Sequence, residues 1–413
     1  MSTNVLVLVV YPDETGLLDL TVAGRPAGRY LLDSLNRQHD VDVQFVGGPN
    51  CQVPTWCDSY HADLRDVPRE HSSAGRDRPH SVVIDGAAWF SDEALGKLLD
   101  RAREMTSAFR LFESLTGARQ GDRPARLLGA VMQRSEALAG ADSWRITAHQ
   151  GLAETLNSVS TGLMEDVAVA DLDTSRHALL IDCYASLATV EQWVLLDRAM
   201  DAMRRGVRLR DPGRVYIRGE VTYGSDVEID IDVILEGEVV LGNRVRIGAH
   251  SIVNASQIGE NACIHPFSLV EQSRVGANGF VGPYGRIRPG CNIGDSVQIG
   301  NYVEVKNSQI GAGSRINHHS FIGDAVLDDH VTIGAGTITC NHDGTRTHQT
   351  LVGRGAYIGS GCNLVAPLRI GDGATVGAGS TITQDVPAGK LTLARTPQTT
   401  VEGWKGPRKQ PGE

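Results

Sequence analysis

Histidines gather in one stretch of the second half of the chain, where they could do acid–base chemistry. His318 and His319 are adjacent, and two more histidines lie in the polar segment 340–350 (CNHDGTRTHQT). A neutral imidazole can accept a proton near pH 7, which makes this residue type a suitable general base. The His, Asp and Arg content of segment 340–350 indicates a functional loop, and a tolerated surface insertion is the alternative.

A single lysine lies in the same half of the chain. Basic residues are almost all Arg, and Lys306 is the only lysine between Lys97 and Lys390. Two interpretations stay open. Lys306 has a functional role that needs a compact ammonium group in place of the planar guanidinium of Arg, or it is an ordinary surface lysine.

These residues lie within a six-residue repeat that predicts the fold. Aliphatic residues recur in sets with a step of six, and the first six sets begin 17 or 18 residues apart. Three six-residue sides make one triangular coil, so the repeat predicts a hexapeptide β-helix whose coils stack about 4.8 Å apart. The step from Leu327 to Val352 is about seven residues longer than a coil needs, and the surplus falls in segment 340–350. The sets begin at Leu241, Ile258, Val275, Ile293, Ile310, Leu327, Val352 and Ile370.

Composition excludes several classes of function. The 413 residues carry a formal net charge of −10 and no basic stripe, which argues against nucleic-acid binding. The apolar run 5–10 is too short for a signal peptide or a membrane span. Seven scattered cysteines without metal-type spacing suit reduced thiols. These features predict a soluble cytoplasmic protein that binds neither nucleic acid nor membrane.

The first half of the chain has the pattern of an α/β domain, residues 1–183. Buried strands are predicted at Val5–Val10, Val41–Val46 and Ser81–Ile84, and Ser91 can cap a helix that runs to about Met105.

A connecting helix and linker are predicted over residues 184–213, before the β-helix at 214–387 and an extended arm at 388–413. Thr189 and Gln192 match a capping box, which places the helix at Thr189 to Arg205, and Gly206 can end it.

Several long motifs in fixed order resemble one known family. The segments LRDPGRVYIRGEVTYGSDVEID, VGPYGRIRPG, GNYVEVKNSQIG, IGAGTITCNHDG, IGSGCNLVAPLRIG and RTPQTTVEGW, within about residues 184–405, resemble the bifunctional glucosamine-1-phosphate N-acetyltransferase / N-acetylglucosamine-1-phosphate uridyltransferase. The resemblance implies a left-handed β-helix, a homotrimer with sites between subunits, acetyl-CoA as acyl donor, a small-molecule amine acceptor, and no metal for acetyl transfer.

The resemblance also implies roles for particular residues. His318 matches the catalytic base. His319 is expected at the acceptor-binding side and competes for the role of base, and Asn341 matches a residue that orients the acceptor amine. Glu304 is expected to hold the imidazole tautomer, with a plain surface carboxylate as the alternative. Arg288 and Lys306 match a cationic pair for the acceptor phosphate. On the CoA side the matching residues are Ala335, Ser360, Ala378 and Arg395, with Trp404, Lys405 and Arg408 in the arm as weaker candidates.

Departures from the family fall on the acceptor side. Phe321 replaces a Tyr, Thr332 replaces an Asn, and Thr347 replaces a loop Lys. A site that hydrogen-bonds its substrate discriminates strongly, so the lost donors predict a changed acceptor. The expected function is acetyl-CoA-dependent N-acetylation of a small anionic amine: an amino-sugar phosphate analogue, or a carboxylated amine or hydrazine of a specialised pathway.

The N-terminal domain is expected to be a degenerate, structural relic of a nucleotidyltransferase. After the first strand the chain reads Tyr11-Pro-Asp-Glu-Thr-Gly16, where Pro removes an amide donor and two carboxylates would repel phosphate. The family's metal-binding Asp falls at Ala87, which predicts no uridyltransferase activity.

Three alternatives compete with this hypothesis. One is a monofunctional glucosamine-1-phosphate N-acetyltransferase, and another is a non-catalytic trimeric scaffold. The third is a γ-type carbonic anhydrase, a zinc enzyme on the same fold. Its long-then-short histidine spacing is not reproduced by His318, His319, His330, His342 and His348, so no metal site is predicted.

Overall fold

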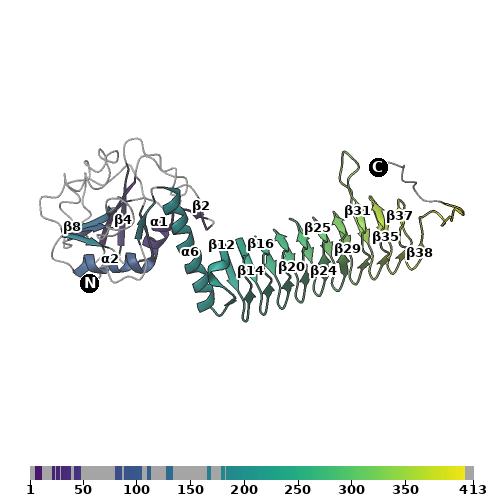
Figure 1. The fold of residues 1–413 in the computed structure, drawn as a ribbon, viewed down its shortest axis with the longest axis horizontal. Coiled ribbons are helices and arrows are strands. Elements are labelled where there is room, and N and C mark those ends of the chain that lie inside the picture. The colour runs from purple at the N-terminus through teal and green to yellow at the C-terminus, as the bar shows by residue number, and fades with distance from the viewer. Residues whose placement is uncertain are drawn as a thin grey trace, which may run out of the picture. The chain divides into compact units, whose positions relative to one another are not determined.

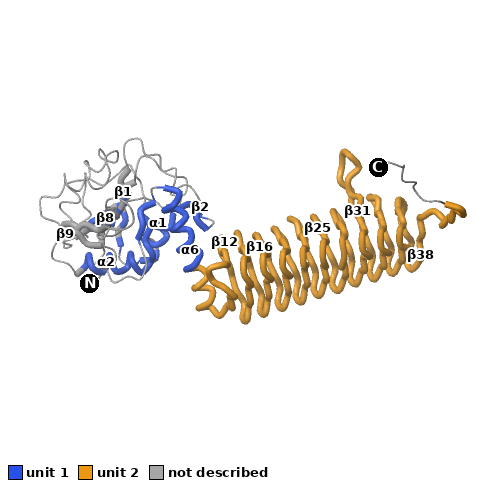
Figure 2. The backbone as a smooth tube through the Cα atoms, viewed as in Figure 1, with its two compact units in different colours: residues 1–197 blue, residues 198–413 orange. Residues whose placement is uncertain are grey.

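The chain forms two compact units, residues 1–197 and 198–413 (Figure 2). The computed structural model describes residues 5–11, 21–23, 25–27, 29–38, 41–47, 80–85, 88–104, 109–112, 127–133, 165–168, 178–181 and 183–404. The boundary between the units lies inside helix α6 (Tyr184–Arg204), whereas the sequence pattern places it just before that helix.

The first unit contains a mixed six-stranded sheet. Strand β1 pairs in parallel with β4 on one side and β5 on the other, and β8 joins β5 in the antiparallel sense. The three predicted strands are confirmed, because each lies within one of these elements. In spatial order the sheet contains β4 (Val41–Gly47), β1 (Val5–Tyr11), β5 (His80–Asp85), β8 (Leu127–Gln133), β7 (Phe109–Phe112) and β9 (Glu165–Ala168).

Two helices of this unit bury leucine-rich faces. In α1 (Arg29–Arg37) the residues Leu31, Leu32 and Leu35 are buried, and α2 (Asp92–Glu104) buries its own leucines in the same way. The predicted cap of α2 is confirmed, because the Ala94 amide donates to Ser91 Oγ at 3.1 Å. Four short strands complete the unit: β2 (Thr21–Val22), β3 (Arg25–Pro26), β6 (Ala88–Phe90) and β10 (Ala178–Leu180). Residues 12–16, which stand where the family has its nucleotide loop, and position 87 lie outside the described residues.

Helix α6 begins five residues earlier than its capping-box pattern predicts. The Cys183 amide donates to Ser186 Oγ at 3.1 Å, which caps the helix six residues before Thr189. Thr189 lies inside the helix, where its hydroxyl donates to the Ala185 carbonyl at 2.9 Å. The predicted end is confirmed: Gly206 is left-handed with φ 91°, and its amide donates to the Met203 carbonyl.

The second unit is a left-handed parallel β-helix of hexapeptide repeats (Figure 1). Regular coils contribute one strand to an 11-stranded sheet and two consecutive strands to a 17-stranded sheet, which together give three sides. The 3₁₀ turn η4 (Pro212–Arg214) leads into these coils. The 11-stranded sheet contains β11 (Arg208–Leu209), β13 (Glu228–Ile229), β15 (Arg246–Ile247), β18 (Cys263–Ile264), β21 (Phe280–Val281), β24 (Gln298–Asn301), β27 (Arg315–His318), β30 (Thr332–Ile333), β33 (Tyr357–Ile358), β36 (Thr375–Val376) and β38 (Leu391–Thr392).

The 17-stranded sheet carries the other two sides of the coils. The loop 341–349 interrupts it between β31 and β32 and projects from the solenoid (Figure 1). The sheet contains β12 (Val215–Tyr223), β14 (Val233–Leu241), β16 (Ile252–Asn254), β17 (Gln257–Ile258), β19 (Leu269–Glu271), β20 (Arg274–Val275), β22 (Arg286–Ile287), β23 (Asn292–Ile293), β25 (Glu304–Lys306), β26 (Gln309–Ile310), β28 (Phe321–Gly323), β29 (Ala325–Leu327), β31 (Ile338–Cys340), β32 (Thr350–Val352), β34 (Asn363–Val365), β35 (Leu368–Ile370) and β37 (Thr381–Ile382).

The aliphatic residue of each repeat forms the solenoid core. Ile299, Ile316 and Ile333 follow one another in register on adjacent coils and are at most 3% exposed. Burying one such side chain stabilises the fold by roughly 1.5–3 kcal/mol. Because the inward positions are fixed by this core, the outward residues of successive coils form straight columns. Among the described residues, no helix is both long and apolar enough to cross a membrane.

Candidate functional site

One corner of the solenoid brings the predicted base and the predicted CoA residues into a single column. Each lies two positions after the buried aliphatic residue of its strand in the 11-stranded sheet, so successive coils stack them in order. Backbone contacts join neighbours: Gly361 N donates to the Ala335 carbonyl at 2.7 Å, and Gly379 N to the Ser360 carbonyl at 2.8 Å. We call this the corner column; it consists of Asn301, His318, Ala335, Ser360 and Ala378.

His318 is exposed, and the residue one coil before it fixes its tautomer. Its Nδ1 lies 2.9 Å from Asn301 Oδ1, and an amide oxygen can only accept, so Nδ1 carries the proton. In the neutral ring Nε2 is then the free acceptor, and among the described residues it has no hydrogen-bond partner. This is the form that a general base requires.

Within one chain Glu304 has another partner than the imidazole of His318. Its Oε1 instead accepts from Arg288 NH1 at 2.9 Å. The reason is topological: Glu304 lies on β25 of the 17-stranded sheet, whereas His318 lies on β27 of the 11-stranded sheet.

Beyond His318 the corner is lined by small residues. Ala335, Ser360 and Ala378 are each followed by a left-handed glycine, with φ between 68° and 73°, and a Cβ at the last two of these glycines would meet nothing within 4 Å. Arg395 closes the far end of the column, because its NH1 donates to the Ala378 carbonyl at 3.0 Å. The result is an open shelf with a base at one end and a guanidinium at the other. The shelf glycines are Gly336, Gly361 and Gly379.

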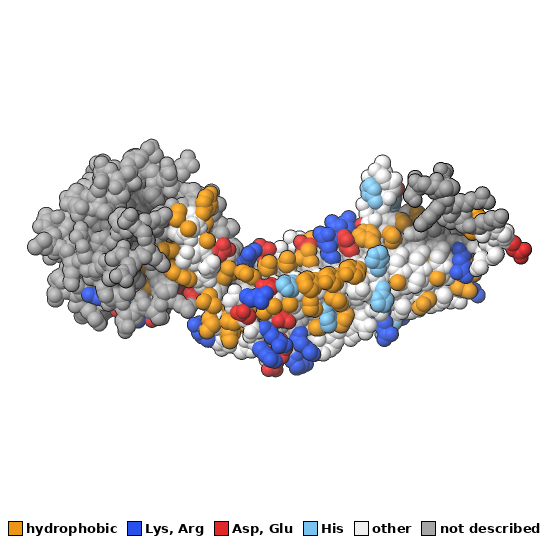
Figure 3. Space-filling view, viewed as in Figure 1, with side chains coloured by type: hydrophobic (Ala, Val, Ile, Leu, Met, Phe, Trp, Pro, Cys, Tyr) orange, Lys and Arg blue, Asp and Glu red, His pale blue; other side chains and the backbone are white. Residues whose placement is uncertain are grey.

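Before His318 the same corner carries a stack of rings instead of glycines. Phe267 and Tyr284 lie face to face with centroids 5.0 Å apart, and Tyr284 and Tyr302 are also 5.0 Å apart. His250 stacks on Phe267 at 4.8 Å, which matches the spacing of the coils. An apolar band runs along this part of the solenoid surface (Figure 3). We call these four residues the ring ladder. His319 occupies the next position of the same corner, in the left-handed conformation with φ 41°.

The predicted cationic pair lies on a neighbouring side of the coils, and both cations have carboxylate partners. Glu304 forms an ion pair with one guanidinium nitrogen of Arg288, and Lys306 Nζ lies 3.8 Å from Asp324 Oδ2. Both charges are therefore partly compensated within one chain. Both pairs are partial, because Arg offers five donors and the lysine contact is longer than a hydrogen bond.

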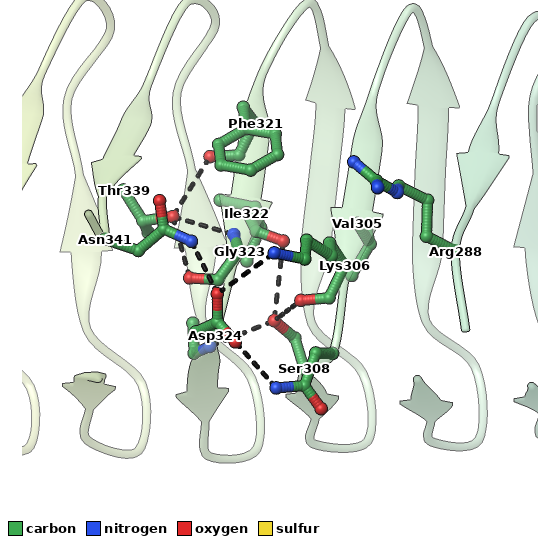
Figure 4. A network of polar contacts seen from close by, with 12 residues as sticks. Arg288, Val305, Lys306, Ser308, Phe321, Ile322, Gly323, Asp324, Thr339 and Asn341 are labelled. Carbon is green, nitrogen blue, oxygen red and sulfur yellow. Dashed lines mark hydrogen bonds and ion pairs between the residues drawn. The ribbon is translucent and has the colours of Figure 1, made fainter. Parts of the chain in front are cut away.

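Asp324 and Asn341 lie beside Lys306 (Figure 4). Asn341 Nδ2 donates to Asp324 Oδ2 at 2.5 Å, and Asn307 Nδ2 donates to Asp324 Oδ1 at 2.6 Å. The ring of Phe321 packs over Gly323, where an added Cβ would lie 2.6 Å from the ring.

Sequence reasoning missed Asn301, Asn307, Gly323 and Asp324. A signal was present for two of them, because Asn307, Asp324 and Asn341 recur every 17 residues, one coil apart.

Three predicted acceptor-side residues do not join this group within one chain. Thr332 lies on β30 of the 11-stranded sheet, His319 lies at the ring-ladder corner, and Thr347 lies in the projecting loop. The loop is held by Asp343, which accepts from His348 Nε2 at 2.7 Å. That hydrogen bond, followed by those from the Arg346 and Thr345 amides, lowers the pKa of Asp343 well below its usual range. In the arm, Trp404 is exposed, and Lys405 and Arg408 lie outside the described residues.

Comparisons with known proteins find several similar sequences. The family model for the bacterial transferase hexapeptide (six repeats) matches residues 349–384. The bifunctional protein GlmU of Acidithiobacillus ferrooxidans is 48% identical over 238 residues, which cover 58% of this chain and 52% of the relative. The chain is therefore similar to GlmU over this stretch. GlmU of Ralstonia nicotianae is 49% identical over 243 residues, 57% of this chain and 53% of the relative.

The chain spans about half the length of the GlmU relatives that it matches. Among solved structures, LpxA from Acinetobacter baumannii is 17% identical over 42% of this chain and 71% of that chain, with a TM-score of 0.29, too low to support an argument. The described residues contain no group of three or more His, Cys, Asp or Glu side chains that could hold a metal ion.

Proposed function

We propose that this chain is an acetyl-CoA-dependent N-acetyltransferase that acts on a small anionic amine. The observation that carries the proposal is the corner column, in which a tautomerically fixed histidine and three small residues follow one another on adjacent coils, with Arg395 at its far end. The small residues leave room for the pantetheine arm of CoA, and Arg395 is placed to pair with a CoA phosphate. The similarity to GlmU supports the same assignment.

In the proposed reaction His318 accepts the proton of the acceptor amine. The amine nitrogen attacks the thioester carbonyl, a C–N bond forms, and Nε2 takes the proton that the nitrogen loses. The C–S bond then breaks, and the sulfur leaves as the thiol of CoA when His318 returns the proton. Asn301 contributes by keeping Nδ1 protonated, so that Nε2 is the acceptor. A positioned base of this kind is worth about 10²–10⁴-fold in rate.

The acceptor would lie against Arg288, Lys306, Phe321 and Asn341. The two cations keep donors for an anionic group of the substrate, since Glu304 engages one nitrogen of Arg288 and Lys306 is 3.8 Å from its carboxylate. Phe321 offers a ring face and no hydroxyl. This chemistry suits an amino-sugar phosphate analogue, or a carboxylated amine or hydrazine.

We propose that the working cleft lies between copies of this chain in a homotrimer. Thr332 and the cationic pair lie on different sheets of one solenoid, so one chain does not bring all the predicted acceptor residues together. A neighbouring copy packed alongside could complete the site. Sedimentation that finds a fully active monomer would overturn this arrangement.

We also propose that the chain has no uridyltransferase activity. The support comes from the sequence that follows β1, where Pro12, Asp13 and Glu14 stand in place of a glycine-rich phosphate loop. Release of pyrophosphate from UTP with N-acetylglucosamine-1-phosphate and Mg²⁺ would refute the proposal.

The test of the acetyl-transfer proposal is a panel of amines assayed with acetyl-CoA by release of the CoA thiol. The panel includes glucosamine-1-phosphate, amino-sugar phosphates, amino acids and carboxylated hydrazines. We expect an anionic amine to be acetylated and glucosamine-1-phosphate to be a poor substrate. Efficient turnover of glucosamine-1-phosphate would contradict the proposed change of acceptor and would identify that sugar phosphate as the substrate.

Two histidine variants assign the base within the same assay. His318→Ala is expected to lower kcat at least about a hundredfold with unchanged acetyl-CoA affinity, because it removes the proton acceptor alone. His319→Ala is the matched control from the neighbouring position and should keep most of the activity. The reverse pattern would show that His319 is the base.

A further inference from the structure

Asp324 is the centre of the polar network beside the proposed acceptor site. Its side chain is 11% exposed, and three neighbouring side chains direct nitrogen atoms at it: Asn307, Asn341 and Lys306. Its own amide donates to the Lys306 carbonyl at 3.0 Å. We propose that Asp324 is a positioning residue that holds the Asn341 amide with its carbonyl oxygen toward the acceptor amine. This inference rests on the proposed acetyl transfer.

The orientation of both amides follows from the chemistry of the carboxylate. An ionised carboxylate accepts hydrogen bonds and donates none, so each asparagine must turn its NH₂ group to Asp324. The contacts of 2.5 Å and 2.6 Å are made by Nδ2 in both cases. The oxygen of Asn341 consequently points away from Asp324, as Figure 4 shows. A carbonyl oxygen in that direction can accept a hydrogen bond from an amine N–H.

An asparagine at position 324 would break this pattern without changing its shape. Asn has one oxygen and one NH₂ group, so it can accept from only one of its two neighbours, and the other neighbour must turn or lose its partner. The backbone would tolerate the change, because residue 324 is left-handed with φ 52°, a conformation in which Asn is favoured. Asp324→Asn therefore changes hydrogen-bond direction and charge while it leaves the backbone and the side-chain volume in place.

The same logic supplies a rescue, the double variant Asn307→Asp with Asp324→Asn. In this variant the new carboxylate at position 307 accepts from the NH₂ group of the new amide at position 324. The oxygen of that amide is then free to accept from Asn341. The double variant thus shifts the carboxylate from position 324 to position 307, one coil earlier and next to Lys306. The orientation of Asn341 is restored. Position 307 is also left-handed, with φ 43°, and Asp is tolerated there.

The experiment compares the wild type, Asp324→Asn, Asn307→Ala and the double variant, each assayed with acetyl-CoA and the amine that the panel identifies. Asn307→Ala is the matched control, because it removes the other partner of Asp324 and leaves Asn341 correctly held. We expect Asp324→Asn to lower kcat/KM for the amine about tenfold to a hundredfold with an unchanged KM for acetyl-CoA. Asn307→Ala and the double variant should stay within about fivefold of the wild type.

The midpoint of thermal unfolding gives a second readout that needs no activity. The midpoint should fall in Asp324→Asn and recover in the double variant, because both partly buried hydrogen bonds to residue 324 are made again. An Asp324→Asn variant as active as the wild type, or a folded double variant as impaired as the single one, overturns the positioning role. If Asp324→Asn does not fold, the activity of the double variant alone tests the positioning role. A wild type that releases no thiol with any amine, while the unfolding midpoints follow the expected order, means that the proposed function has failed and the positioning role with it.

Discussion

The same corner of the solenoid is built in two different ways on either side of His318. On the N-terminal side, four successive coils fill it with stacked rings, from His250 to Tyr302. On the C-terminal side, the equivalent positions are Gly336, Gly361 and Gly379. The backbone conformation is left-handed in both halves, so the turn itself does not require glycine. The glycines are better explained by the space that they leave open.

This difference teaches how a uniform repeat can carry a localised site. The buried aliphatic positions are alike in both halves, and they keep the coils in register. Function is then decided by outward positions that the core does not constrain. We infer that the ring ladder closes the corner and that the glycine shelf leaves it free for CoA.

Extending the ring ladder into the shelf is the change with the largest expected effect. Gly361→Tyr would place a ring over the proposed pantetheine path. The backbone can accept it, because Tyr284 and Tyr302 adopt the equivalent conformation with φ 56° and 54°. We expect acetyl-CoA affinity to fall at least about a hundredfold, measured by calorimetry.

The control for this change is Gly373→Tyr at a different corner. Gly373 is also left-handed, with φ 60°, and a Cβ there would meet nothing within 4 Å. It should leave acetyl-CoA affinity unchanged. An equal loss of acetyl-CoA affinity in Gly361→Tyr and Gly373→Tyr would show that the shelf has no special role in binding.

Removing the guanidinium at the far end of the shelf should have a smaller effect. Arg395→Ala takes away the proposed phosphate contact and leaves His318 untouched. One charge-assisted hydrogen bond contributes about 1.5–3 kcal/mol, so acetyl-CoA affinity should fall about tenfold to a hundredfold. The value of kcat at saturating acetyl-CoA should stay close to that of the wild type. A loss confined to kcat would place Arg395 at the reacting atoms instead.

Truncating the ring ladder should affect stability and not CoA binding. Tyr284 stacks on rings on both sides, so Tyr284→Ala should lower the free energy of unfolding by about 1–3 kcal/mol. Chemical denaturation measures this change, and calorimetry should find acetyl-CoA affinity unaltered. Weaker acetyl-CoA binding in this variant would mean that the ladder, too, contacts the donor.

The smallest expected effect is a pH dependence next to the ladder. Partial burial, assisted by the charge of Arg246, lowers the pKa of His265, whose ring packs against Phe280. The unfolded chain therefore binds this proton more readily, so stability should fall as the pH drops through about 6.5 toward the folded pKa. His265→Gln should flatten that part of the profile in denaturation series between pH 8 and pH 5. An unchanged slope would assign the dependence to another group.

The repeat and the core were predictable from the sequence, because an aliphatic residue every six positions has one structural solution. The order of His318, Ala335, Ser360 and Ala378 along one column follows from the same spacing. The spacing alone does not say which of several candidate partners an outward side chain contacts. Glu304 pairs with Arg288 and not with His318, since strands of different sheets separate the latter two.

The start of α6 shows a second limit. Two capping patterns lie six residues apart, and the structure uses the upstream one, at Cys183 and Ser186. The helix then continues unbroken through Thr189. Local capping residues alone do not rank such alternatives. The network around Asp324 was within reach, because the 17-residue spacing of Asn307, Asp324 and Asn341 matches one coil.

A structure of the protein with bound CoA is the most direct test of the comparison between the two halves of the corner. The account predicts the pantetheine arm against Ala335, Ser360 and Ala378, with its sulfur within about 4 Å of Nε2 of His318 and a phosphate beside Arg395. It also predicts no CoA contact along the ring ladder from His250 to Tyr302. CoA bound along the ladder, or with its sulfur at another side of the solenoid, would contradict the account.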